Sequence, residues 1–137
     1  MDDAPEMVLN RALAQLLHDH DLAVYDLADV VERGIRLDGR MPTTVKQFTL
    51  LTPLRPISEG RADVTYRTQV FTRRKGTIAT VRTWSAGLRA VLDQKAYTPQ
   101  VLGISWATEF SATDFGPNSD GYSDTVATYA FRGRRVI

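Results

Sequence analysis

Residues 62–92 change their hydrophobic period from two to about three and a half, and the change falls near Gly76. In the first half, apolar and polar side chains alternate, as expected for a strand with one buried face. That face carries Val64, Tyr66, Thr68 and Val70. In the second half, Thr77 favours a helix N-cap, and an apolar stripe follows at helical spacing. The stripe contains Ile78, Val81, Ser85, Leu88, Val91 and Leu92. The pattern predicts a strand, a short basic turn over residues 73–76 and an amphipathic helix.

Upstream, the sequence predicts one more helix and two strands. Residues 6–18 have a stripe typical of an amphipathic helix, made of Leu9, Leu13, Leu16 and Leu17. Residues 22–25 form a short apolar run that favours a first strand. Residues 44–52 are rich in β-branched and aromatic side chains and predict a second strand. We expect Pro53 and Pro56 to end it, because proline cannot donate a hydrogen bond to a neighbouring strand.

Downstream, the sequence predicts two strands separated by a long loop. Residues 102–111 alternate, and the face expected to be buried carries Leu102, Ile104, Trp106, Thr108 and Phe110. Residues 113–124, TDFGPNSDGYSD, have the composition of a loop, and residues 123–132 are a further strand candidate. We therefore predict one small α+β domain over residues 1–137. Its sheet has four or five mainly antiparallel strands, and two helices pack on it.

The composition is ordinary for a soluble globular protein, with 43% hydrophobic and 24% charged residues among 137. No apolar run approaches the roughly 20 residues needed to cross a bilayer. Asp2 and Asp3 contrast with the basic start of a signal peptide, so we expect a cytoplasmic protein without membrane contact. The absence of cysteine excludes disulfides, thiolate zinc sites and cysteine nucleophiles.

The net charge of +1 conceals a separation of charge along the chain. Residues 1–32 contain eight acids and one base, and residues 33–95 contain thirteen bases and four acids. Residues 96–131 contain four acids and no base. Each block is explained by a solvated face of its own element. Surfaces of opposite sign would also allow identical subunits to meet head to tail.

No residue set predicts catalysis or metal binding. His18 and His20 are two positions apart, so on a helix they point in different directions, and no third ligand has matching spacing. The GxSxG, GxxxxGK[ST] and GxGxxG motifs are absent. Two acidic pairs are better explained as turn and capping residues: Asp26 with Asp29, and Asp120 with Asp124. We therefore expect no enzymatic activity, no cofactor and no required metal.

Two short basic clusters have the chemistry to contact phosphates, namely residues 73–75 and residues 132–135. Both are short, and the pI of about 8.1 lacks the basic surplus of a nucleic-acid domain. A solvated turn and a solvated tail explain them better. Trp84 and Trp106 are compatible with the core or with a subunit interface.

The order and texture of the predicted elements resemble the tail terminator proteins of long-tailed bacteriophages. The likeness extends from about residue 7 to residue 135. It rests on an N-terminal helix, the segment MPTTVKQFTLLTPL, the strand ADVTYRTQVFTRRKG leading directly into the helix TIATVRTWSAGLRAVL, and a final long-looped β pair. The resemblance implies a small α+β domain that assembles into a ring, usually hexameric, on the end of the tail tube.

In that family the ring halts tube polymerisation and presents the surface that joins the DNA-filled head. The resemblance therefore implies a virion structural protein at the head-proximal end of the tail, present in the host cytoplasm during assembly. Its expected partners are copies of itself, the tail tube protein and a head–tail connector protein. DNA would pass through the ring without sequence-specific binding.

On this interpretation, basic residues near the strand–helix junction contribute to a subunit or partner interface: Arg67, Arg73, Arg74, Lys75 and Arg82. They would face an acidic surface drawn from residues 2–32 or 109–124. The loop over residues 113–123 is expected to be mobile in the isolated subunit and to order against a partner. Its expected contact residues are Asp114, Phe115, Asn118, Asp120 and Tyr122.

Two other functions remain open at this point. A different head–tail connector or a minor capsid component would share the fold and the ring symmetry. A small cytoplasmic module that binds a ligand or nucleic acid would use the sheet face and its arginines.

Overall fold

The computed structural model describes residues 4–26, 31–37, 40–42, 44–60 and 62–134, and these ranges contain two helices and six strands. In chain order they are α1 (Pro5–Asp19), β1 (Gly34–Arg36), β2 (Phe48–Glu59), β3 (Asp63–Lys75), α2 (Ile78–Leu92), β4 (Lys95–Ala96), β5 (Trp106–Phe115) and β6 (Tyr122–Arg134). The predicted α+β class is confirmed, and the sheet has six strands instead of four or five because β1 and β4 are short additions at its edges.

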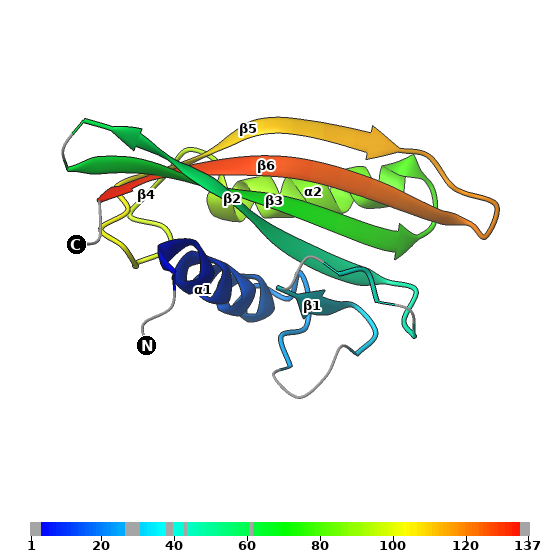
Figure 1. Ribbon diagram of the computed structural model, residues 1–137. Helices are drawn as coiled ribbons and strands as arrows, with labels where there is room; N and C mark the ends of the chain where they lie inside the picture. Colours follow the sequence, from blue (N-terminus) through cyan, green and yellow to red (C-terminus); the bar gives the residue numbers. More distant parts are fainter. Residues whose placement is uncertain (1–3, 27–30, 38–39, 43, 61, 135–137) are drawn as a thin grey trace.

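The strands form one curled sheet in the order β1-β2-β3-β6-β5-β4 (Figure 1). β1 is parallel to β2, and the other neighbours are antiparallel. The long strands β3 and β6 pair along their whole lengths in the centre. Helix α1 packs on β2 and β3, while α2 packs on β6, β5 and β3, so the two helices cover the same face. We call the opposite side of the sheet the helix-free face.

Helix α1 confirms the leucine stripe predicted for residues 6–18. Pro5 occupies the first turn, where its missing N–H leaves no intrahelical bond unmade. The buried stripe also includes one polar side chain, Asn10. The Thr68 hydroxyl donates to Asn10 Oδ1 at 2.8 Å, so this buried amide is satisfied by the sheet.

Helix α2 begins at Ile78, and its buried residues match the predicted stripe: Val81, Ser85, Leu88 and Leu92. Thr77 occupies the N-cap position, although its side chain makes no capping hydrogen bond. On β3, the predicted face is also buried and continues through Thr72 to Arg74. The basic segment 73–75 is therefore the end of a strand instead of a turn, because β6 pairs with it as far as Lys75.

The prediction that prolines end the second strand is wrong. β2 runs through Pro53 and Pro56 to residue 59. β1 pairs only with residues 48–50 of β2, so the later half of β2 is a sheet edge in the described part of the chain. Pro56 also lies inside a shift of register between residues 54 and 57. A missing N–H is tolerated at an edge or a bulge, where no neighbouring strand needs it.

The face predicted for residues 102–111 is also wrong for its strand portion. Leu102 and Gly103 have φ values of 56° and 63°, and β5 begins only at Trp106. Ile104 reaches the core from the preceding loop, whereas within the strand Ala107 is buried and Trp106 is 44% exposed. The turn at residues 102–103 breaks the alternation that the sequence alone suggests.

The predicted loop over residues 113–124 is shorter than its composition indicates. β5 extends to Phe115 and β6 begins at Tyr122, which leaves residues 116–121 as the connection. The polar residues at its ends have partners across the sheet: the Thr125 hydroxyl donates to Asp114 Oδ1 at 2.7 Å. Asp124 is a strand residue with an arginine partner, which corrects its assignment as a turn residue. Asp29 lies outside the described residues.

The apolar segment predicted as a strand at residues 22–25 contributes a single parallel bridge between Val24 and Gly34. The pairing does not extend beyond this bridge, because the neighbouring strand β1 has only three residues. The dipeptide Asp38-Gly39 is typical of a reverse turn, and it lies outside the described residues.

Candidate subunit interface

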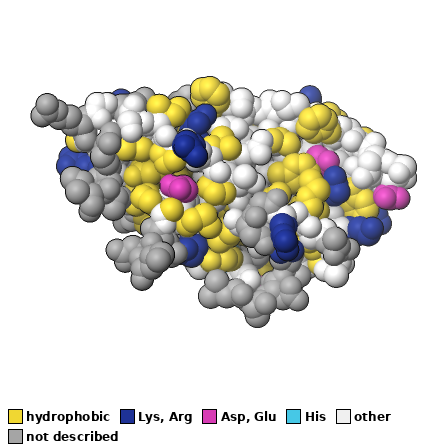
Figure 2. Space-filling view, in the orientation of Figure 1, with side chains coloured by type: hydrophobic (Ala, Val, Ile, Leu, Met, Phe, Trp, Pro, Cys, Tyr) yellow, Lys and Arg dark blue, Asp and Glu magenta, His cyan; other side chains and the backbone are white. Residues whose placement is uncertain are grey.

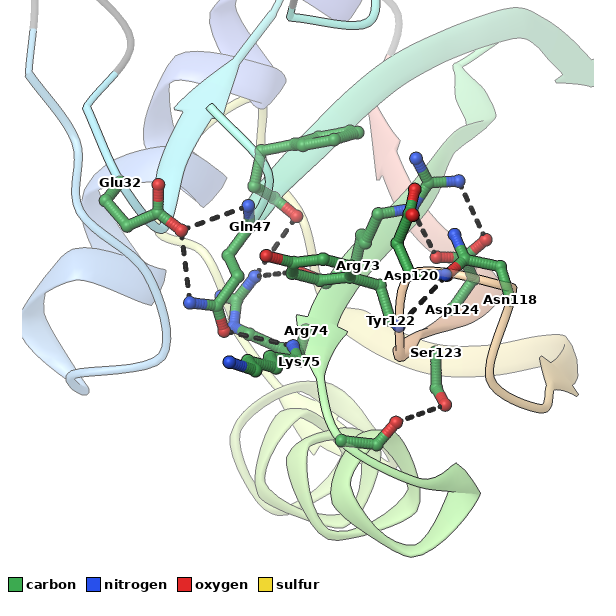
Figure 3. Close-up of polar contacts among 12 residues, drawn as sticks. Glu32, Gln47, Arg73, Arg74, Lys75, Asn118, Asp120, Tyr122, Ser123 and Asp124 are labelled. Atoms are coloured by element: carbon green, nitrogen blue, oxygen red, sulfur yellow. Dashed lines mark hydrogen bonds and ion pairs between the residues drawn. The ribbon is translucent and has the colours of Figure 1, made fainter. Parts of the chain in front are cut away.

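Arg74, one of the predicted interface residues, points into the protein and is 5% exposed. Its Nη1 donates to the backbone oxygens of Phe48 and Arg73 at 3.1 and 2.9 Å (Figure 3). Its Nη2 donates to the Leu22 carbonyl at 3.1 Å, and its guanidinium lies 5.6 Å from the centre of the Trp84 ring. This arginine fastens β2, β3, α2 and the segment after α1 together.

The charge of Arg74 has no carboxylate partner among the described residues. Burial, assisted by the nearby charge of Arg33, lowers the pKa of Arg74 to about 10, and Glu32 opposes this shift. Neutral carbonyl oxygens therefore replace water as the hydrogen-bond acceptors of this buried cation.

Arg73 and Lys75 have different surroundings from Arg74. Arg73 lies on the helix-free face, where its Nε donates to Asp124 Oδ1 at 2.7 Å and its guanidinium lies 5.7 Å from the rings of Phe48 and Phe71. The hydrogen bond to Asp124 raises the pKa of Arg73, and burial opposes that change. Lys75 is exposed at the end of β3.

The predicted basic and acidic contact residues also meet within one chain. Arg82 Nε donates to Asp114 Oδ2 at 3.1 Å, which parallels the pair between Arg73 and Asp124. Arg67 Nη2 donates to the Arg55 carbonyl, while the buried Arg67 Nε has no hydrogen-bond partner in the described part of the chain. Asp114, Asp124 and Glu109 thus each form an ion pair with an arginine of the same chain, and the expected contact between a basic and an acidic surface of two subunits stays a prediction.

The connection between β5 and β6 is fixed by its own side chain, Asn118. Its Oδ1 accepts from the backbone N–H groups of Asp120 and Tyr122 at 2.9 and 3.1 Å (Figure 3). The N–H of Gly76 donates to the Gly121 carbonyl, and this ties the connection to the start of α2. Asn118 therefore acts inside the turn, and the expected contact of this segment with a partner stays a prediction.

Three aromatic side chains on β5 are exposed, and we call them the β5 strip: Trp106, Phe110 and Phe115, with 44%, 71% and 52% of each exposed. Phe110 occupies the register shift between residues 109 and 111, so it has no direct partner on β6. β4 pairs only with residues 106 and 107, which leaves the outer edge of β5 beyond them without a partner strand among the described residues.

The sequence predicts Phe115 as a contact residue, leaves Trp106 open between core and interface, and places Phe110 on the buried face of its strand. The alternation of residues 102–111 contains no indication of the bulge or of which face is buried. Figure 2 shows hydrophobic side chains at several places on the surface in view, with a few charged side chains among them.

A groove lies between α1 and the segment 97–101, with a volume of about 420 Å³. Leu16, Pro99 and Val101 contribute apolar surface, and Tyr97 is 68% exposed beside it. In Figure 1, α1 and the yellow segment after β4 lie at the end of the molecule opposite the arrowhead of β5. The groove and the far end of the β5 strip are therefore two different surfaces.

Among the residues that the structure describes, neither histidine belongs to a cluster of potential metal ligands. His18 Nδ1 accepts from the backbone N–H of Tyr25 at 3.1 Å, and His20 is exposed at the end of α1. In the described ranges, no group of three or more His, Cys, Asp or Glu side chains is placed to hold a metal ion. Neither of the two described helices combines the length and the apolar character needed to cross a membrane.

No protein-family model matches the chain, and no curated protein matches it.

Proposed function

We propose that this protein is a virion structural protein that forms a ring on the end of a phage tail tube, stops tube polymerisation and provides the surface for head joining. The resemblance of the sequence to tail terminator proteins supports this function, and the fold agrees with the class that the resemblance implies. The observation that carries the proposal is the β5 strip, because three large aromatic side chains exposed along one strand favour a protein–protein contact.

A closed ring requires a head-to-tail contact between two different surfaces of each subunit. In our proposal the β5 strip of one copy, chiefly Phe110 and Phe115, occupies the groove between α1 and residues 97–101 of the next copy. Complete burial of the two phenylalanines would contribute about 1.5–3 kcal/mol each. In this arrangement the ion pairs of Arg73 and Arg82 stabilise β6 and β5 inside one subunit, and apolar contacts hold neighbouring subunits together.

A mixing experiment tests the head-to-tail contact. The strip variant carries Phe110→Ser and Phe115→Ser, and the groove variant carries Gln15→Trp, which places a bulky side chain on the exposed rim of the groove. Each variant alone should remain monomeric in sedimentation velocity. Their mixture should form dimers, because one intact strip and one intact groove remain.

Met41→Ser is the matched control, since Met41 is a 51% exposed apolar residue outside both surfaces. It should assemble like the unaltered chain. Strip and groove variants that still assemble alone, or a mixture that forms no dimer, would contradict the contact.

Electron microscopy of particles produced without this protein tests the function itself. We expect overlong tubes and tails without heads, and restoration of normal particles by the Met41→Ser variant. Tails of uniform length that join heads at normal yield would refute the proposed function.

A further inference from the structure

A second feature, unrelated to the β5 strip, is a cavity of about 490 Å³ at the end of β3. It is bounded by the start of β2, the residue before β1 and the first half of α2. The lining side chains are Arg33, Gln47, Arg74, Lys75, Thr80, Thr83 and Trp84. Three of these carry positive charge, and no carboxylate from the described part of the chain lines the cavity.

The positive charge around this cavity is only partly offset by its surroundings. Arg74 donates to carbonyl and hydroxyl oxygens, which carry no net charge. Glu32 is the nearby acid that acts on Arg74, and its Oε1 accepts from the backbone N–H and Nε2 of Gln47 at 3.2 and 3.1 Å. Its single negative charge offsets part of the charge of the three cations. Burial is the main cause of the lowered pKa of Arg74, and the nearby charge of Arg33 adds to it.

The cavity is also held in shape by the fold. Gln47 Oε1 accepts from the Lys75 N–H at 3.1 Å, and the Gln47 carbonyl accepts from the Arg33 N–H at 2.8 Å. Figure 3 shows Gln47, Arg74 and Lys75 gathered at the end of β3, with the Gln47 amide between Glu32 and the backbone of Lys75. The backbones that carry the three cations are thus joined through one glutamine.

We propose that this cavity binds a phosphate-type oxyanion. Two or three cations around one opening match a group with up to two negative charges and several acceptor oxygens better than they match a single carboxylate. Thr80 and Thr83 add hydroxyl groups at its wall. Free phosphate and the phosphates of a DNA backbone share this chemistry. The inference does not depend on ring formation.

Titration with inorganic phosphate at constant ionic strength, followed by Trp84 fluorescence, tests the site. Binding should saturate and should weaken about tenfold for each of Lys75→Gln and Arg33→Gln, as expected for loss of one charge-assisted contact. Lys95→Gln is the control, because Lys95 is an exposed lysine on β4, outside the cavity. Urea midpoints of all variants should match that of the unaltered chain, which separates lost binding from lost folding.

A duplex DNA arm, measured by fluorescence anisotropy at several salt concentrations, distinguishes the two sources of phosphate. If DNA is the ligand, Lys75→Gln and Arg33→Gln weaken duplex binding and free phosphate competes with it. If free phosphate is the ligand, the same variants lose phosphate binding and leave the duplex signal unchanged. The proposal is overturned if neither ligand saturates, or if Lys95→Gln weakens binding as much as the cavity variants.

Discussion

Replacing Arg74 with methionine tests whether the buried guanidinium holds the sheet edge and α2 together. Methionine keeps much of the side-chain length and removes the charge and all donors. The change would delete three hydrogen bonds to the carbonyls of Phe48, Arg73 and Leu22, at 3.1, 2.9 and 3.1 Å. It would also delete a longer bond to Thr49 Oγ1 at 3.4 Å, which is not counted among these three. Leu22 would keep the bond from Trp84 Nε1 at 2.8 Å, so its carbonyl would not be left without a partner.

The expected loss of stability is the difference between two opposing quantities. Hydrogen bonds from a charged donor contribute roughly 1.5–3 kcal/mol each, or about 4.5–9 kcal/mol for three. Lowering the pKa from 12.5 to about 10 corresponds to about 3 kcal/mol of unfavourable burial that methionine would relieve. We therefore expect Arg74→Met to lower the free energy of unfolding by about 1.5–6 kcal/mol.

Urea denaturation followed by tryptophan fluorescence measures this change, because one of the two tryptophans contacts Arg74. Lys75→Met is the matched control, because it also replaces a cationic side chain with methionine, one residue later and at an exposed position. It should change stability by less than about 0.5 kcal/mol. An Arg74→Met variant as stable as the unaltered chain would refute the structural role. Arg74 would then be retained for ligand binding alone.

Two further predictions concern packing and pH. Gly133→Ala should destabilise the fold by about 1–3 kcal/mol, because its added Cβ would lie 2.9 Å from the Leu102 carbonyl oxygen. The control Gly116→Ala has open space around the added Cβ and should leave stability unchanged. Equal urea midpoints for the two variants would contradict the predicted clash at Gly133. Burial, assisted by Glu109, raises the pKa of Tyr129, so its contribution to stability is complete below about pH 10 and falls as pH rises further. Tyr129→Phe should reduce that fall in alkaline denaturation series, whereas the exposed Tyr97→Phe should not; identical slopes would argue against the burial of this hydroxyl.

The elements that the sequence predicted well are those with one strongly buried face. The stripes of α1 and α2 and the alternation of β3 follow directly from the faces that pack together. The passage of β2 through Pro53 was not predictable from local preference, because it depends on the absence of a neighbour beyond residue 50. The polar strand ends at Asp114 and Asp124 likewise depend on partners from distant elements.

The candidate interface was less predictable than the fold for the same reason. Phe115 was named from its position in a polar segment, but the exposure of Phe110 depends on a bulge against β6. A bulge shifts one residue out of the alternating pattern, and the residue type at position 110 does not indicate that a bulge occurs there. Alternation alone therefore places Phe110 on the wrong face. The cationic cavity combines residues from four segments, and no spacing within one segment indicates it.

Arg73, Arg74 and Lys75 are adjacent in sequence, yet strand geometry separates their roles. Reversing all three to glutamate would test the expected contact between a basic and an acidic surface. The change would also break the pair with Asp124 and place a carboxylate against the carbonyls around Arg74. Such a buried, unpaired charge would destabilise the subunit by several kcal/mol, on the order of the loss for breaking a buried pair. A failure of this variant to assemble would then result from unfolding of the subunit and would not test the contact between subunits. Lys75 alone can be changed without either effect, and it lies on the cationic cavity, so its charge reports on anion binding while the β5 strip reports on assembly.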